Sequence, residues 1–371
     1  MPTRDASAPS TLTDRLLSLD FFRGLTMFLL IGESTRIYER LIDPAFQGTL
    51  IYAIGTQFHH HPWNGLRFWD LIQPFFMFIV GVAIPFSVSK RLAAGDSRAT
   101  VTRHAVRRAF LLLLLGWALY CIEPGRITFR FQNVLAQLSV TYLLAYLIMR
   151  KKPRTQIAVA FGLLAATELL YRFFPVAGFD QAFVPDHNFG SYVDMLISGE
   201  LSSGHWVSFN AIPTAAHTIW GVLAGQWLMG GAPPNRKAGR LAAAGLALLA
   251  AGYGLGFVTP IIKRIATSSF VLASGGWCLL VLALSYWVID IKRLRGWTKF
   301  FAIVGMNSLF IYLVQESGGT NWLTRLVAPF ANGFFGWWGK LPAQIIASLG
   351  AWALLWSMCL WLYRRKILIK I

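Results

Sequence analysis

Ten apolar segments recur along the chain, and each is close to the length that a membrane-spanning helix needs. A helix takes about 20 apolar residues to cross the hydrocarbon core of a bilayer. The ten segments cover residues 20–40, 69–89, 105–122, 131–149, 155–175, 212–230, 239–258, 268–289, 299–317 and 343–363. They predict an all-α fold: a polytopic transmembrane helical bundle of about ten spans.

The composition excludes a soluble protein. Of the 371 residues, 56% are hydrophobic and only 13% are charged, whereas soluble domains carry about 25% charged residues. Half the usual charge cannot cover a soluble surface of this size. Cys121, Cys278 and Cys359 fall in apolar segments and lack the spacing of metal ligands, so we expect no metal.

The formal net charge of +18 is distributed unevenly between the predicted loops. Loops on one side of the spans hold 23 Lys and Arg residues, and loops on the other side hold 10. Because cytoplasmic loops of membrane proteins are enriched in Lys and Arg, we expect both termini in the cytoplasm and a multi-pass protein of the inner membrane. This distribution explains the net positive charge without a nucleic-acid partner, and we expect membrane lipids to surround the chain.

The domain organisation is simple. Residues 1–16 are polar and predict a disordered cytoplasmic tail, and residues 17–371 predict a single transmembrane domain. The first apolar segment contains charged residues and no small-residue cleavage pattern, so a cleavable signal peptide is not expected. We find no internal repeat, which weakens an inverted-repeat transporter. A homodimer stays open.

One loop is rich in groups that catalyse reactions. His59, His60 and His61 stand in a row, and Asp70 follows at the start of the second apolar segment. A neutral imidazole accepts a proton near physiological pH or acts as a nucleophile, and a nearby carboxylate sets its tautomer. The alternative is an exposed polar loop with incidental histidines. A zinc site is less favoured, because the spacing is unfamiliar.

Several charged residues fall inside or beside apolar segments. Arg23 follows Asp20 where the first segment begins, which fits either an anion site for a phosphate-bearing cofactor or a helix start with a snorkelling arginine. Glu33 and Glu168 are expensive to bury in a membrane and are therefore functional hypotheses.

Two amides and a basic pair have competing interpretations. Asn307 and Gln137 lie within apolar segments, where amides commonly hydrogen-bond neighbouring helices. Lys263 and Arg264 precede the eighth segment and either bind a substrate or lie at the membrane interface.

Sequence pieces spread over the chain together resemble one family. They are residues 18–26 (SLDFFRGLT), 60–66 (HHPWNGL), 70–81 (DLIQPFFMFIVG), 107–108 (RR), 134–137 (VLAQ), 188–194 (NFGSYVD), 268–272 (SSFVL), 275–277 (GGW) and 305–312 (GMNSLFIY). In this order they resemble the transmembrane acyltransferases of the heparan-α-glucosaminide N-acetyltransferase type, including bacterial relatives linked to N-acetylglucosamine use. The resemblance extends from about residue 17 to about residue 365.

The resemblance implies acetyl transfer across a membrane. Such enzymes take acetyl-CoA from the cytoplasmic side and acetylate the amine of a terminal glucosamine on the other side. Their active histidine precedes the tryptophan by three positions, which selects His60. Two departures concern the acceptor: Ser34 stands where many relatives carry Asn, and residues 208–213 replace an Asp-Pro-Glu-Gly stretch.

On this basis we expect three groups of site residues. His60 would deprotonate the amine or carry the acetyl group, Asp70 would orient His60, and Asn307 would donate to the developing oxyanion. The residues expected to bind acetyl-CoA are Arg23, Arg107, Arg108 and Gln137. Those expected to bind the amino-sugar acceptor are Asp194, Lys263, Trp63 and Glu33.

Two other functions remain open at this stage. One is an amino-sugar transporter that performs no chemistry. The other is an O-acetyltransferase that modifies hydroxyl groups of an envelope polysaccharide.

Overall fold

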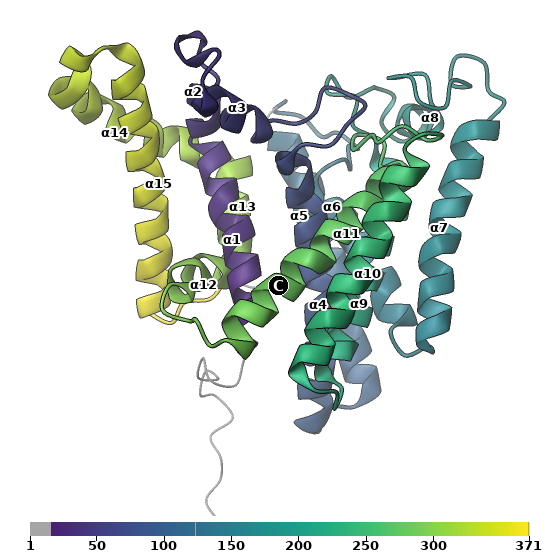
Figure 1. Ribbon diagram of the computed structural model, residues 1–371. Helices are drawn as coiled ribbons and strands as arrows, with labels where there is room; N and C mark the ends of the chain where they lie inside the picture. Colours follow the sequence, from purple (N-terminus) through teal and green to yellow (C-terminus); the bar gives the residue numbers. More distant parts are fainter. Residues whose placement is uncertain (1–15, 123, 370) are drawn as a thin grey trace, which may run out of the picture.

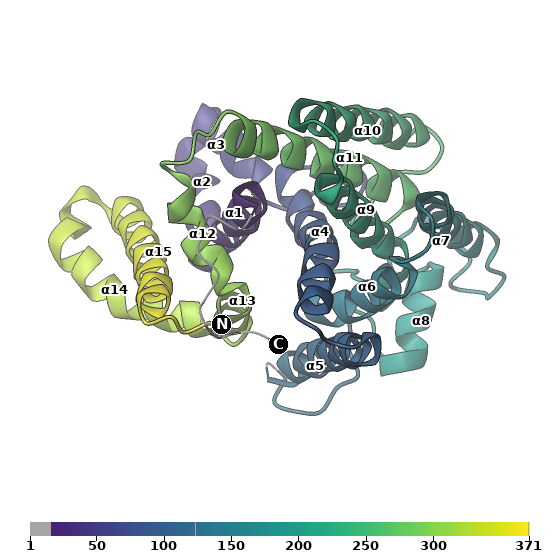
Figure 2. The ribbon, with the colours of Figure 1, turned by 90° about the horizontal axis from the view of Figure 1, so that it is seen from below.

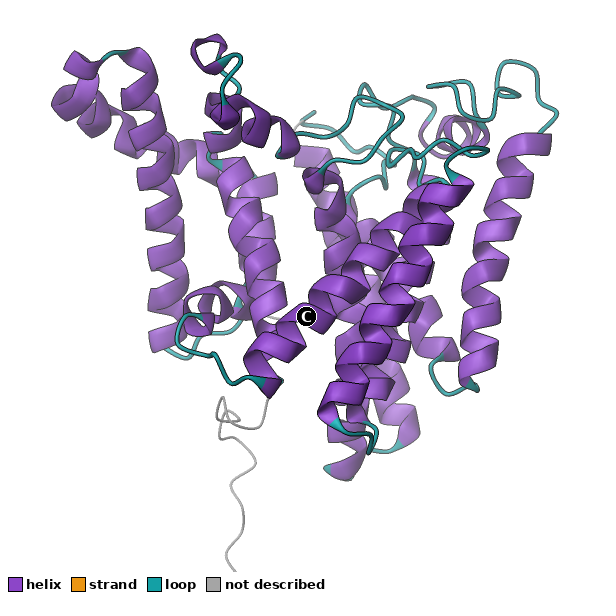
Figure 3. Ribbon diagram, in the orientation of Figure 1, coloured by secondary structure: helices purple, strands orange, loops and turns teal. Residues whose placement is uncertain are grey.

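The computed structural model describes residues 16–122, 124–369 and 371, and the regular elements in these ranges are helices (Figure 3). Of the predicted tail, residues 1–16, only Leu16 lies within the described ranges. The helices are α1 (Leu17–Ser34), α2 (Ile37–Leu41), η2 (Pro44–Phe46), α3 (Leu50–Gln57), η3 (Phe68–Leu71), α4 (Ile72–Ala93), α5 (Arg98–Ile122), α6 (Val134–Ile148), α7 (Pro153–Phe173), α8 (Phe189–Ser198), η4 (Ser208–Asn210), α9 (Ala211–Met229), α10 (Pro234–Leu255), α11 (Ser268–Ser285), η5 (Tyr286–Ile291), α12 (Thr298–Met306), α13 (Ser308–Glu316), α14 (Gly319–Phe335), η6 (Gly336–Trp338) and α15 (Lys340–Arg364). This confirms the all-α prediction.

Each of the ten predicted segments coincides with helix. Within the described ranges, six helices are long and apolar enough to cross a membrane, and a seventh candidate is the bent pair α12 and α13. The chain is therefore a multi-pass membrane protein. The count of about ten spans stays a prediction, because α1, α6 and α9 do not meet the same criteria of length and hydropathy.

Two predicted segments are not single straight helices. Residues 20–40 divide between α1 and α2, because Arg36 adopts a left-handed backbone with φ of 63°. Residues 299–317 bend by 66° between α12 and α13, at Asn307.

The helices form two groups that meet where α1 packs against α4 and α11, seen most clearly along the bundle (Figure 2). One group contains α1, α12, α13, α14 and α15, and the other contains α4 to α7 and α9 to α11. Glycines let helices approach closely within each group: a side chain at Gly24 of α1 would collide with the backbone of Phe301, and one at Gly81 of α4 with that of Thr218.

The long loops gather on one face of the bundle. The histidine loop, α8 and the loop between α10 and α11 lie at the upper end in Figure 1. Helix α1 begins and α15 ends at the lower end of the same view. The histidine loop is thus separated from these two helix ends by the depth of the bundle, as the predicted alternation of loops requires. Which end faces the cytoplasm stays a prediction.

Candidate active site

His60 and Asp70 form a hydrogen-bonded pair at the start of the second span. His60 Nδ1 lies 2.9 Å from Asp70 Oδ1. Since a carboxylate only accepts, Nδ1 carries the proton in this contact and Nε2 keeps its lone pair. The Asp70 side chain is 1% exposed, whereas that of His60 is 30% exposed. Asp70 is therefore the buried member of the pair, and the imidazole of His60 is accessible.

The local fold holds Asp70 in one orientation. Its second oxygen, Oδ2, accepts hydrogen bonds from the backbone N–H of His61 at 3.2 Å and of Arg67 at 2.9 Å. Arg67 in turn donates from Nη1 to the carbonyl of His60 at 3.1 Å. These bonds close the loop between His60 and the short helix η3, so the carboxylate cannot turn away from the imidazole.

The neighbouring histidines have different surroundings. His59 Nδ1 lies 2.9 Å from the carbonyl of Gly55. The His61 ring packs against Gly65, whose φ of 152° and lack of a side chain permit the contact. Of the three imidazole rings, that of His60 is the one that bonds Asp70.

A second loop brings a lysine to the same histidine. Gly65 donates its N–H to the carbonyl of Ile261 at 2.8 Å, and Ile261 donates to Asn64 Oδ1 at 3.0 Å. Two residues later, Lys263 Nζ lies 3.1 Å from His60 Nδ1 and 4.0 Å from Asp70 Oδ1. The indole of Trp206 stands beside both His60 and Lys263.

The charges at this pair follow from burial. Desolvation lowers the pKa of His60 from 6.5 to about 4, and the Lys263 ammonium acts in the same direction against the opposing Asp70 carboxylate. Desolvation also lowers the pKa of Lys263 from 10.5 to about 8, while Asp70 and Glu33 oppose the shift. At neutral pH, His60 is therefore an uncharged imidazole beside a lysine that is mostly protonated.

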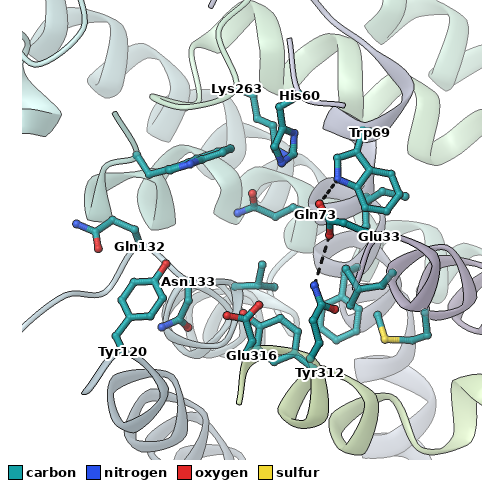
Figure 4. A pocket seen from close by; sticks show the side chains of 17 residues that line it. Glu33, His60, Trp69, Gln73, Tyr120, Gln132, Asn133, Lys263, Tyr312 and Glu316 are labelled. Carbon is teal, nitrogen blue, oxygen red and sulfur yellow. Dashed lines mark hydrogen bonds between the residues drawn. The ribbon is translucent and has the colours of Figure 1, made fainter. Parts of the chain in front are cut away.

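His60 faces a cavity of about 200 Å³ between the two helix groups, which we call the His60 pocket. Figure 4 shows Lys263 and His60 together on one wall, with Tyr120 and Glu316 across the pocket. Further polar lining comes from segments far apart in the sequence, namely Glu33, Gln73, Gln132, Asn133, Trp206, Tyr312 and Gln315. A small molecule with several hydroxyl or amino groups would find donors and acceptors on every side.

Glu33 is the carboxylate of the first span in this pocket. It accepts a hydrogen bond from Trp69 Nε1 at 2.7 Å and one from Gln315 Nε2 at 3.4 Å (Figure 4). Both donors are neutral, and in the described part of the chain no Lys, Arg or His side chain forms an ion pair with Glu33. Lys263 and His59 act on this partly buried carboxylate through space and form no ion pair with it, so a cationic ligand group that bonds it directly would suit this position.

The His60 pocket continues toward the opposite end of the bundle. A cavity of about 320 Å³, the middle cavity, shares Phe76 and Tyr312 with the His60 pocket. It is lined by Arg23 and Arg108 among apolar side chains. A third cavity of about 270 Å³, the basic cavity, shares Ser87, Arg108 and Tyr142 with the middle one. The three cavities form a series between His60 and the lower end of the bundle.

The basic cavity is lined by several cationic side chains. Its lining includes Arg91, His104, Arg107 and Arg108. The guanidinium of Arg108 stacks over the ring of Tyr142 at 4.9 Å from the centroid, and its Nε is buried without a hydrogen-bond partner. Arginine forks of this kind match phosphate oxygens. Arg23, Arg107 and Arg108 thus lie along one route, as the sequence-based hypothesis requires.

Three predicted site residues lie behind these walls instead of lining them. Gln137 accepts a hydrogen bond from Gln73 and donates to the carbonyl of Gln132. Asp194 accepts hydrogen bonds from Gln132 Nε2 at 3.1 Å and from the backbone of Ser208 at 3.0 Å. Trp63 donates to the carbonyl of Phe183 at 2.8 Å. Each of them positions a loop or a lining side chain.

Asn307 does not line the His60 pocket, and its expected role at the oxyanion stays a prediction. Its Nδ2 donates to the carbonyl of Ile367 at 3.2 Å, and its Oδ1 accepts from the N–H of Ile369 at 3.0 Å. The side chain is fully buried, and both ends of its amide are hydrogen-bonded to the backbone of these two residues. Ile369 and Ile371 line the middle cavity.

Glu168 also receives a structural explanation. It accepts hydrogen bonds from Arg172 and from Thr259 Oγ1, both at 2.6 Å, and is thus paired within the protein.

Some lining residues escaped sequence reasoning. Gln73 stands three residues after Asp70, inside a motif that we had singled out, so its place near His60 could have been inferred. Gln315 and Glu316 follow the last motif directly. Trp206, Arg91 and His104 carry no local signal, because only the three-dimensional packing brings them to a cavity.

Among the described residues, no group of three or more His, Cys, Asp or Glu side chains could hold a metal ion.

Comparison with known proteins points to the family that the motifs resemble. No protein-family model matches the chain. The heparan-alpha-glucosaminide N-acetyltransferase of mouse (Mus musculus) is 26% identical over 85% of this chain and 54% of its own length. The human (Homo sapiens) protein of that name is 26% identical over 98% of this chain and 61% of its own length. The chain spans less than two thirds of either relative, and both matches support the resemblance to heparan-α-glucosaminide N-acetyltransferases.

Proposed function

We propose that this chain transfers an acetyl group from acetyl-CoA to the amine of glucosamine or of a glucosamine-terminated saccharide on the opposite side of a membrane. The observation that carries the proposal is the series of cavities between the basic cavity and the buried His60–Asp70 pair. The two acetyltransferase relatives add independent support.

The donor enters through the basic end. The phosphates of acetyl-CoA bind Arg91, Arg107 and Arg108, while Arg23 lies further along the route in the middle cavity. The pantetheine arm extends through the middle cavity, and the thioester reaches the His60 pocket. Ile369 and Ile371 border this route, so the donor arm packs beside them.

The chemistry takes place at Nε2 of His60. Asp70 holds the proton on Nδ1, so the Nε2 lone pair either accepts a proton from the acceptor amine or attacks the acetyl carbonyl. In both cases the C–S bond of the thioester breaks and a C–N bond to the acceptor forms. The acceptor ammonium loses two protons overall: one leaves with the CoA thiol, and the other is released to water. The imidazolium that forms in between is stabilised by Asp70.

The acceptor enters from the face of the long loops. Its amino group, which arrives protonated, meets the carboxylate of Glu33, and its hydroxyl groups meet Gln73, Gln132 and Tyr120 in the pocket wall. With the loops of the acceptor side outside, both termini lie in the cytoplasm and the chain resides in the inner membrane.

The test uses the full chain in sealed vesicles with glucosamine inside and labelled acetyl-CoA outside. The proposal predicts labelled N-acetylglucosamine inside, dependent on the protein. Passage of glucosamine without acetylation would identify a transporter instead. Preferential acetylation of a saccharide that lacks an amine would identify an O-acetyltransferase.

A further inference from the structure

A deep apolar groove opens on the outer side of the second helix group. It has a volume of about 620 Å³ and lies between α7 and α10, with α9 as its floor. Figure 2 shows α10 and α7 on either side of α9 at the edge of the bundle. The lining residues are Pro153, Ile157, Phe161, Trp220, Leu223, Ala224, Gln226, Trp227, Leu241, Ala244, Ala247, Leu248 and Leu279. This groove is separate from the three cavities of the proposed donor route.

The shape and lining of the groove suit hydrocarbon chains. From Pro153 to Phe161 along α7 the groove extends for roughly 12 Å at the rise of an α-helix. Apart from Gln226, every lining side chain is apolar. Both bordering helices are membrane-span candidates whose surfaces are mostly unburied, so the groove faces the bilayer. Lipid acyl chains are the hydrocarbon available there.

One end of the groove carries only positive charge. Seven basic residues lie within one turn or two of Pro153 and Pro234, where α7 and α10 begin: Arg150, Lys151, Lys152, Arg154, Arg236, Lys237 and Arg240. Neither residues 149–167 nor residues 229–256 contain an Asp or Glu. None of the seven forms an ion pair within the described ranges. Their charge is left for a partner outside the chain.

One of these cations packs against a side chain that lines the groove, and a second bonds the end of α9 beside it. The guanidinium of Arg240 stacks over the ring of Trp227, 5.3 Å from its centroid, and Trp227 lines the groove. Lys237 donates from Nζ to the carbonyl of Leu228 at the end of α9, at 2.8 Å. The enrichment of Lys and Arg in cytoplasmic loops explains basic loops in general, but it does not explain a guanidinium stacked at the rim of an apolar groove.

We propose that this groove binds a phospholipid with a negatively charged headgroup. The acyl chains occupy the space between α7 and α10, and the phosphate lies at the basic end near Arg240 and Lys237. Basic sites between transmembrane helices favour acidic lipids in this way. Charge complementarity selects an anionic lipid over a zwitterionic one, because the site offers cations and no carboxylate.

The test is the retention of added lipid by the full-length purified protein, measured by native mass spectrometry after delipidation. Phosphatidylglycerol and phosphatidylcholine with the same acyl chains are the probes. We expect stoichiometric retention of phosphatidylglycerol only. The double variant Arg240→Gln with Lys237→Gln should lower its affinity roughly tenfold or more.

Three further variants separate the effect of the groove's volume from that of its charge. Ala247→Trp fills the groove and should abolish retention while the cations remain. Arg98→Gln, at the start of α5, and Ala250→Trp, outside the lining of the groove on α10, are matched controls that should retain the lipid.

Equal retention of both lipids, unchanged retention in the double variant, or closure of the groove by a second copy of the chain would overturn the proposal. Lipid retention is measured without substrate, so the result is independent of the proposed acetyl transfer.

Discussion

Asp70 Oδ1 lies 2.9 Å from His60 Nδ1, and the same carboxylate is fixed by two backbone N–H groups through its other oxygen. The imidazole is thereby held with Nε2 free in a cavity lined by both helix groups. An orientation of this kind is what a general base or a nucleophile needs, because the lone pair must point to the reacting atom before the substrate arrives.

Replacing Asp70 with Asn should lower the rate of acetyl transfer by roughly 100-fold or more, because the imidazole loses the partner that sets its tautomer. The rate is measured with acetyl-CoA and glucosamine at saturation. A matched control exists in the chain: His205 and Asp186 form the same kind of pair at 2.7 Å, and neither lines the His60 pocket. If Asp186→Asn lowers the rate as much as Asp70→Asn does, the pair at His60 has no special role.

The pH dependence of the transfer rate should report the unusual environment of His60. Its pKa is lowered to about 4 by burial and by Lys263. Because the acceptor binds in its ammonium form, the rate at saturating substrates should stay level from pH 7 to pH 5 and fall only as pH approaches the pKa of His60. Removing the positive charge in Lys263→Met raises that pKa, so the fall should move to higher pH. A wild-type fall centred near 6.5, the ordinary pKa of histidine, would be inconsistent with this environment.

Glu33→Gln should weaken binding of the acceptor and spare the donor. Loss of the charge removes the partner of the acceptor's ammonium, which should raise the KM for glucosamine roughly tenfold with little change in the KM for acetyl-CoA. Glu39→Gln is the control, because Glu39 lies at an exposed ion pair with Arg36 outside the pocket. An unchanged KM for glucosamine in Glu33→Gln would exclude Glu33 from acceptor binding.

Arg108→Gln should weaken binding of the donor through its phosphates. We expect the KM for acetyl-CoA to rise roughly tenfold. The KM for acetylpantetheine, which lacks the nucleotide phosphates, should change little. Arg103, which is exposed on the same helix and does not line the basic cavity, provides the control variant Arg103→Gln. An equal effect on both donors would mean that Arg108 does not bind the phosphates.

The helices were predictable because their signal is local. A run of about 20 apolar residues that crosses a bilayer has to form a helix, because a helix pairs its backbone N–H and C=O groups within the segment. This holds wherever the run stands in the chain. The break at Arg36 and the bend at Asn307 were not predictable, since both fall within apolar runs and depend on contacts with distant segments.

Contacts in the site between residues that are close in sequence were predictable, whereas contacts between distant segments were not. His60 and Asp70 are ten residues apart and belong to one motif. The positions of Asn307 and Gln137 outside the cavity walls were not predictable, because an amide in a span has many potential partners. In the folded chain Asn307 hydrogen-bonds Ile367 and Ile369, and Gln137 hydrogen-bonds Gln73. The approach of Lys263 to His60 depends on the pairing of two loops about 200 residues apart.

The most direct test of the account compares His60→Ala with His59→Ala in the vesicle assay with acetyl-CoA and glucosamine. His60→Ala should lose acetyl transfer while it still binds CoA and elutes as a folded protein in detergent. His59→Ala should keep most of the activity, because its ring bonds the carbonyl of Gly55 and does not line the His60 pocket. Turnover of His60→Ala at the wild-type rate would contradict the central role of His60.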